Sequence, residues 1–149
     1  MDAIEAVVDG SINRRAEIDY LLLADHAAVV QGKLYLSGGG WDRVSPAEFP
    51  HQMMIGIAAG IRVPYTETDN AHSVGIRLES GSNAEALVEI QGELEVGRPP
   101  GSRGMDVLIP MAFNLPVTFS EPGDLVLIAS VDGRESKRHQ VRIVPRGGR

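Results

Sequence analysis

Histidine is the side chain best suited to proton transfer and metal binding near neutral pH, and four histidines are spread through the chain. They are His26, His51, His72 and His139. No two of them stand two or four residues apart, and the HExxH pattern of zinc proteases is missing. Asp25 directly precedes His26, so on a strand the two side chains would point to opposite faces. Local spacing therefore predicts no metal site and leaves open only one assembled from distant strands.

Nucleophiles and acid–base pairs are equally scarce in the sequence. The chain has no cysteine, and it lacks the GxSxG pattern that places a reactive serine on a sharp turn. Glu89, Glu93 and Glu95 share one face of an expected strand, where residues two apart lie about 7 Å from each other, a separation that inverting glycosidases use. Every acidic strand face has this spacing, however, and such acids also protect a sheet edge from pairing. We therefore expect no catalytic residue, no enzymatic activity and no cofactor.

Two segments carry side chains that suit binding. The segment LSGGGWDRV (36–44) holds three glycines and the only tryptophan, and VGRPPGSRGMD (96–106) places two arginines around a Pro-Pro-Gly turn. Indole rings stack on sugars, and guanidinium forks hold carboxylates and phosphates. The alternative is structural: the glycines let a strand bend, the tryptophan anchors the core, and the arginines lie exposed on a stiff connection. The candidate binding residues are Trp41, Asp42, Arg43, His72, Arg98 and Arg103.

Composition and charge exclude several classes of function. With 149 residues, of which 43% are hydrophobic and 23% charged, the chain is expected to form one folded domain. Its net charge of −6 divides into +5 from Gly133 to Arg149 and −11 elsewhere, and this acidic body would repel a nucleic acid. No window reaches the ~18 apolar residues of a membrane span, and the first fifteen residues do not resemble a secretory signal. We expect a soluble, cytoplasmic protein without nucleic-acid or membrane partners.

The punctuation of the sequence is that of an all-β domain. Apolar runs of about five to ten residues alternate with glycine, proline, asparagine and aspartate, and no βαβ spacing is present. The first run could also form a short helix, but Gln31-Gly32 makes a two-residue turn after it, and Asp132-Gly133 is the strongest hairpin signal. Gly92 is a natural bulge position, and Pro110 and Pro116 indicate either an edge strand or a strand that crosses between sheets. The expected strands are 18–30, 33–41, 52–63, 72–81, 85–97, 106–119, 124–131 and 138–144.

Seven to eight antiparallel strands in about 130 residues predict a β-sandwich with a short N-terminal extension. A small barrel is the alternative, but the prolines imply open edges and the strand lengths are uneven. We divide the chain into an N-terminal arm at 1–16, the sandwich domain at 17–145 and a basic tail at 146–149. The arm would either lie on a neighbouring molecule or remain a mobile end.

Several segments together resemble a known family. LLADHAAVVQGKLYLSGGGWDRV, VPYTETDNAHSVGIRL, ELEVGRPPGSRG and IPMAFNLPV, the last followed by PGDLVLIASVDG, are similar to an uncharacterised bacterial domain-of-unknown-function family. The resemblance runs from about Ile18 to Val144. It implies a compact β-sandwich and assigns no activity, so it supports the fold and leaves the function open.

Two hypotheses of function follow from the sequence. The first is a non-enzymatic structural or interaction protein whose partner is itself or another protein. It would self-associate through sheet edges, the N-terminal arm and contacts between the acidic body and the basic end. The alternative is a module that binds a small ligand, a sugar or an anion, in loops around Trp41 and Arg98.

Overall fold

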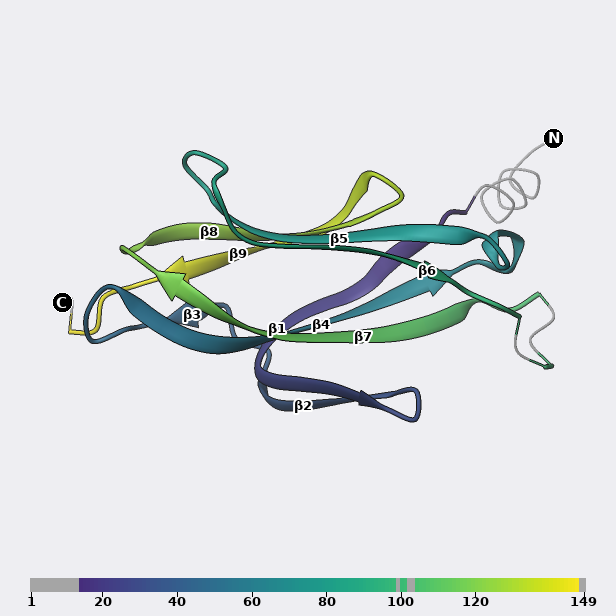
Figure 1. The fold of residues 1–149 in the computed structure, drawn as a ribbon, viewed down its shortest axis with the longest axis horizontal. Helices are drawn as coiled ribbons and strands as arrows, with labels where there is room; N and C mark the ends of the chain where they lie inside the picture. Colours follow the sequence, from purple (N-terminus) through teal and green to yellow (C-terminus); the bar gives the residue numbers. More distant parts are fainter. Residues whose placement is uncertain (1–13, 99, 102–103, 148–149) are drawn as a thin grey trace, which may run out of the picture.

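The chain folds into two packed β-sheets, as the computed structural model in Figure 1 shows; it describes residues 14–98, 100–101 and 104–147. One sheet has the strand order β2-β1-β4-β7 and the other β3-β9-β8-β5-β6, which confirms an all-β sandwich. No helix of these residues is long and apolar enough to cross a membrane. The elements are β1 Glu17–Val30, β2 Lys33–Gly39, β3 Arg43–Val44, β4 His51–Val63, the 3₁₀ helix η1 Tyr65–Glu67, β5 Ala71–Ser80, β6 Ala86–Glu95, β7 Val107–Phe119, β8 Gly123–Val131 and β9 Arg134–Ile143.

The core lies between the two sheets and follows the period-2 alternation of their strands. On β4, Ile57 and Ile61 are fully buried toward the second sheet, where they join Ile76, Leu78 and Leu127. Burial of each such side chain stabilises the fold by about 2 kcal/mol. A slip of one residue would turn a whole row of these side chains away from the core, so burial fixes the register of the strands.

Both two-residue turns that the sequence indicates are present. Gln31 and Gly32 have φ values of 52° and 74°, and Asp132 and Gly133 have 52° and 80°. Two consecutive positive φ angles define the type I′ turn, whose twist matches that of the strands it joins. The first turn closes the β1–β2 hairpin and the second closes the β8–β9 hairpin.

Two details differ from the expectation. The chain has nine described strands rather than seven or eight, because the two residues of β3 pair in parallel with the end of β9. Gly92 does not form a bulge: it pairs regularly with Val74, and the register shift between β5 and β6 lies near Leu87 instead. Pro110 and Pro116 do lie on an edge strand, since β7 borders its sheet.

The second half of β1 leaves its sheet and crosses β4 on the side away from the core. Pairing of β1 with β4 ends at Ala24 and Gly56. A Cβ atom on Gly56 would lie 2.9 Å from the backbone nitrogen of Ala27, so only glycine allows the crossing. Beyond it, the side chain of Asn114 on β7 accepts from the N–H of Ala27 at 2.9 Å and donates to its C=O at 2.7 Å. One amide side chain thus replaces a strand neighbour, and the β1–β2 hairpin, which is the outer part of the four-stranded sheet, lies to one side of the other strands (Figure 1).

Candidate functional site

The candidate binding residues do not gather in one place. Trp41 and Asp42 lie just before Arg43, which pairs with Arg142 near the end of β9. His72 instead contacts Asp132, in the turn that precedes the first residue of β9. The eight residue steps from Arg134 to Arg142 span about 27 Å of strand, so Trp41 and His72 lie at opposite ends of the sandwich. Arg98 lies at the same end of the sandwich as His72, where it bonds to Thr68. Arg103 falls outside the described residues.

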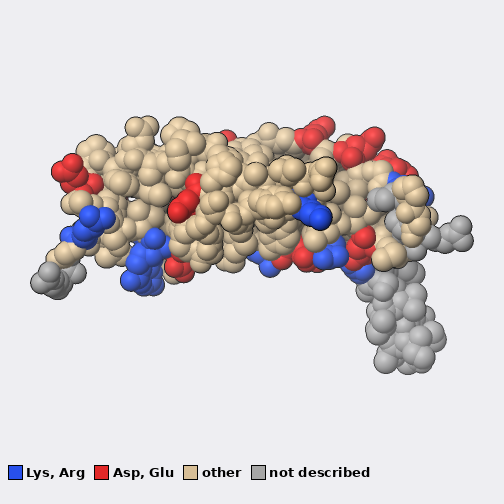
Figure 2. Space-filling model, turned by 90° about the horizontal axis from the view of Figure 1, so that it is seen from below, with Lys and Arg blue, Asp and Glu red and all other residues tan. Residues whose placement is uncertain are grey.

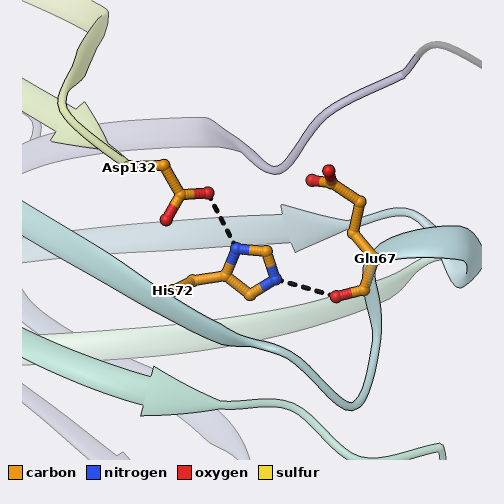
Figure 3. A group of neighbouring side chains, drawn as sticks. All are labelled: Glu67, His72 and Asp132. Atoms are coloured by element: carbon orange, nitrogen blue, oxygen red, sulfur yellow. Dashed lines mark hydrogen bonds and ion pairs between the residues drawn. The ribbon is translucent and has the colours of Figure 1, made fainter.

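His72 is the most enclosed of these side chains, with 4% of its surface exposed. Figure 3 shows its ring between two oxygen acceptors: Nδ1 donates to Oδ2 of Asp132 and Nε2 donates to the main-chain oxygen of Glu67, both at 2.8 Å. A carboxylate and a carbonyl oxygen can only accept, so this geometry is fully satisfied when the ring holds a proton on each nitrogen and carries a positive charge. Neither nitrogen is left to take a proton from a substrate.

Burial and charge shift the pKa values of His72 and Asp132 in opposite directions, and the effect of the charges and hydrogen bonds is the larger. Burial lowers the pKa of His72, but its hydrogen bonds to Asp132 and to the Glu67 carbonyl, together with the Asp132 charge, raise it above the usual 6.5. Burial likewise raises the pKa of Asp132, yet the bonds from His72 and the Ser73 amide and the positive charges nearby bring it below the usual 3.8. Both shifts favour the charged forms, so the fold stabilises the His72–Asp132 ion pair.

Asp132 is also bound to the backbone of β5. Its Oδ1 accepts from the N–H of Ser73 at 3.0 Å, and its own N–H donates to the C=O of Ser73 at 2.9 Å. Through one aspartate, the turn of the β8–β9 hairpin is attached to the start of β5, and through His72 it is attached to η1. We call the group of Glu67, His72 and Asp132 the clamp.

The clamp also contains a set of metal-ligand types. One donor atom each from Glu67, His72 and Asp132 lie within 4.8 Å of one another. A metal ion needs a bare ring nitrogen, whereas both nitrogens of His72 hold protons in good hydrogen bonds, and Oε1 of Glu67 accepts from the N–H of Ala16 at 2.8 Å. A metal would have to displace a proton and break these bonds. The geometry fits a hydrogen-bonded clamp better than a metal centre.

Arg98 is held by neighbouring groups rather than projecting freely. Its guanidinium carbon lies 4.3 Å from the centre of the Tyr65 ring, and its Nε donates to the hydroxyl of Thr68 at 2.6 Å. The carboxylate of Asp69 is 3.5 Å away. Stacking and ion pairing of this kind fix a guanidinium in place. Arg98 braces the β4–β5 connection in this way, with 44% of its side chain exposed.

Trp41 packs against the core, and the glycines before it bend the chain to bring it there. Gly38 and Gly40 have φ values of 58° and 87°, and the N–H of Gly40 donates to the C=O of Leu23 at 2.8 Å. Trp41 is half-buried and borders a cavity of about 360 Å³, whose lining includes Leu21, Leu23, Asp42, His139 and Val141. Its Nε1 is buried and, among the described residues, has no hydrogen-bond partner. Such a donor costs about 1–3 kcal/mol unless an acceptor meets it.

The structure draws attention to a region that the sequence candidates omit. Four large apolar side chains of the β1–β2 hairpin are exposed: Val29 (39%), Val30 (52%), Tyr35 (55%) and Leu36 (37%). The signal was present in the sequence, because apolar residues occupy consecutive positions on both sides of the Gln31-Gly32 turn. By the register of the hairpin, Val29 and Leu36 lie on one face and Val30 and Tyr35 on the other, so each face keeps apolar side chains exposed.

Comparison with known proteins gives a family without an activity. The model of a family described as of unknown function, DUF6941, matches residues 19–144. No curated protein matches the chain.

Proposed function

The chain belongs to the DUF6941 family, a family of unknown function, and we propose that it is a non-enzymatic structural or interaction protein that associates with copies of itself. The observation that carries the proposal is the β1–β2 hairpin, which forms the outer edge of the four-stranded sheet with Val29, Val30, Tyr35 and Leu36 exposed. Exposed apolar side chains that cluster in one element mark an interaction surface.

The charge distribution supports the same surface. Figure 2 looks at the molecule from the side on which β2 lies, and the middle of this face is almost free of charged side chains, which gather toward its ends. Between His26 and Ser37 the only fully charged side chain is Lys33. A molecule with a net charge of −6 can therefore meet a copy of itself here without bringing acidic groups together.

The environment of His72 and Arg98 supports a non-enzymatic role. Both nitrogens of His72 are occupied by oxygens of the clamp, and Arg98 is engaged with Tyr65 and Thr68. General acid–base catalysis needs a group within hydrogen-bond reach of a substrate proton. The proposal also includes a cytoplasmic location, in line with a chain that has no cysteine to form disulfides.

The test is the solution mass of the full-length protein, by size exclusion with light scattering, from about 1 to 200 µM. An apolar interface should give a mass that rises with concentration and persists at ~0.5 M salt, where charge contacts between copies are largely screened. Loss of the oligomer in salt would instead assign self-association to the acidic body and the basic end. A mass of 16.0 kDa under every condition would overturn the proposal.

The N-terminal segment is tested by deleting residues 1–13. The deletion spares Arg14, which pairs with Asp106, and Ala16, which is buried and bonded to Glu67. If the arm contributes to assembly, the oligomer of the truncated protein should dissociate at a higher protein concentration than that of the full chain. An unchanged dissociation curve would remove the arm from the proposal.

A small-ligand module remains the second candidate, and the unpartnered Nε1 of Trp41 favours it. A sugar hydroxyl or an anion that entered the adjoining cavity could accept this N–H if the side chain shifted. Because Trp41 is the only tryptophan, its fluorescence reports on this position alone. A saturable change in emission with one member of a panel of sugars and anions would support the module. The Trp41→Phe variant should lose this signal, and calorimetry should show that it no longer binds the same compound. Emission unmoved by the whole panel would count against it.

A further inference from the structure

The described strands form two sheets with four edges in all, and three of these edge strands carry features that prevent pairing with another chain. β6 presents a row of exposed acids, Glu89, Glu93 and Glu95. β7 is interrupted by Pro110 and Pro116, which have no N–H to donate. β3 is only two residues long. Charges, prolines and shortness are the usual means by which natural sheets block edge-to-edge association.

β2 has none of these protections. It is seven residues long, and its sequence KLYLSGG contains one charge, no acid and no proline. Six of its seven residues are exposed, Tyr35 by 55% of its surface. Beyond β1, no described strand pairs with it. By the criteria that mark the other three edges as closed, β2 is the open one.

The hairpin geometry determines which groups β2 offers. Lys33 closes the two-residue turn opposite Val30, and in a type I′ hairpin this closing pair is hydrogen-bonded. Hydrogen-bonded and non-bonded pairs then alternate, so the main chains of Lys33 and Tyr35 bond to β1. Those of Leu34 and Leu36 point outward. The free edge therefore presents two N–H and two C=O groups, flanked by apolar side chains.

We propose, on the basis of the self-association proposed above, that β2 pairs antiparallel with β2 of a second copy about a two-fold axis at Tyr35. In this register Leu34 faces Leu36 of the second copy, and these outward-pointing residues exchange four hydrogen bonds across the axis. Tyr35 faces its own equivalent, and Lys33 faces Ser37. Every facing pair is apolar, aromatic or free of like charges, so the strand is complementary to itself, as a two-fold interface requires.

A second copy suits this edge better than the acidic edge of β6 does. Two-fold pairing of β2 closes after two molecules, whereas β2 against β6 would leave a free β2 and a free β6 at the ends of every assembly and grow without limit. Pairing of five residues buries less surface than a standard interface, so the dimer should be weak, with a dissociation constant roughly in the micromolar range. The experiment must therefore capture a transient contact.

A single cysteine provides that capture, because the natural chain has none. Facing residues of a non-bonded antiparallel pair have Cα atoms about 4.5 Å apart, within the range of a disulfide. We expect Tyr35→Cys at about 100 µM to form a covalent dimer with oxidised glutathione as the oxidant. Lys33→Cys is the matched control on the same face of the strand, and its two copies would lie four residues out of register, about 13 Å apart. At least tenfold more dimer from Tyr35→Cys on a non-reducing gel supports the register, and equal yields overturn it.

A charge exchange tests the axis without a covalent bond. Tyr35→Lys and Tyr35→Glu each place like charges opposite one another, so each variant alone should be monomeric, and an equimolar mixture should recover the dimer. Both substitutions are at an exposed position, and circular dichroism confirms that each variant folds. If Tyr35→Lys associates more strongly than the natural protein, β2 pairs with the acids of β6 and the two-fold proposal is wrong.

The outcomes separate this inference from the function on which it rests. An oligomer whose mass neither Tyr35 variant changes would overturn the β2 interface and leave self-association standing on another surface. A natural protein that is monomeric up to 200 µM and forms no disulfide as Tyr35→Cys would overturn both.

Discussion

The β1–β2 and β8–β9 hairpins begin from nearly the same turn and end in different surroundings. Val30-Gln31-Gly32-Lys33 and Val131-Asp132-Gly133-Arg134 both form type I′ turns with two positive φ angles. In the second, the turn aspartate bonds to His72 and to Ser73, and the valine before it is 1% exposed. In the first, the turn residue is an exposed glutamine and the valine before it is 52% exposed.

The difference teaches that the turn sets the local geometry while a distant polar partner decides the role of the hairpin. Asp132 finds a buried cation sixty residues away in the sequence and becomes part of the framework. Within the part of the chain that the structure describes, Gln31 has no comparable partner, and its hairpin keeps its apolar side chains on the surface. A framework element and a surface for association can therefore arise from one local pattern.

Among changes that test the difference between the two hairpins, breaking the clamp should have the largest effect on the free energy of unfolding. Asp132→Asn keeps a residue that tolerates the left-handed turn but removes the charge that His72 faces. We expect a loss of about 2–3 kcal/mol in the free energy of unfolding near pH 6, below the usual range for a fully buried pair because 29% of the Asp132 side chain is exposed. Urea denaturation measures it. Gln31→Asn, which places the same residue in the other turn without removing a charge, should leave stability within about 0.5 kcal/mol. Equal effects of the two substitutions would show that the clamp adds no stability.

The valines before the turns sharpen the comparison with a smaller change. Val131→Thr places a hydroxyl in the core without a partner and should destabilise the protein by about 1–2 kcal/mol. Val30→Thr makes the same change at an exposed position, where we expect about 0.5 kcal/mol or less. Thermal unfolding of both variants at low protein concentration, where the protein is monomeric, checks this. A large loss in Val30→Thr under those conditions would mean that the first hairpin is part of the monomer's core.

The pH dependence of stability should be the smallest of the three effects. Because folding raises the pKa of His72, the contribution of this residue is fully present below about pH 6.5 and is lost as the pH rises through the folded-state value. Because folding lowers the pKa of Asp132, its contribution is present above about pH 3.8 and is lost as the pH falls through the folded-state value. Urea midpoints of the natural protein from pH 3 to 9 should be highest between these limits. In Asp132→Asn the decline above pH 6.5 should flatten; an unchanged decline would assign it to other groups.

The parts of this fold that the sequence predicted are those whose causes are local. Gln31-Gly32 and Asp132-Gly133 are adjacent pairs, and the alternation along β5 and β6 is visible within ten residues. β3 was missed because two residues carry no periodicity, and its pairing depends on β9, about one hundred residues away.

The sites depended on contacts that no spacing reveals. His72 was a candidate by its type alone, and its partner Asp132 appeared in the sequence only as a turn former, since aspartate suits that position with or without a histidine nearby. The bond between Asn114 and Ala27 joins residues 87 apart. Trp41 was expected either as an anchor or as a ligand platform, and its half-buried ring with a buried, unpartnered N–H retains elements of both.

The attachment of β1 through Asn114 has a consequence for the motions of the molecule. Beyond Ala24, two hydrogen bonds from one side chain are the bonds described between the backbone of β1 and the sheet that it crosses. The β1–β2 hairpin can therefore open as a unit of its own, without separating any strand pair of the core, at a lower free energy than global unfolding. Amide hydrogens from Ala27 to Ser37 should exchange well before those of β4 and β8. Association through β2 would slow their exchange, so the part of the chain that opens most easily is also the part whose protection would report that a second molecule has bound.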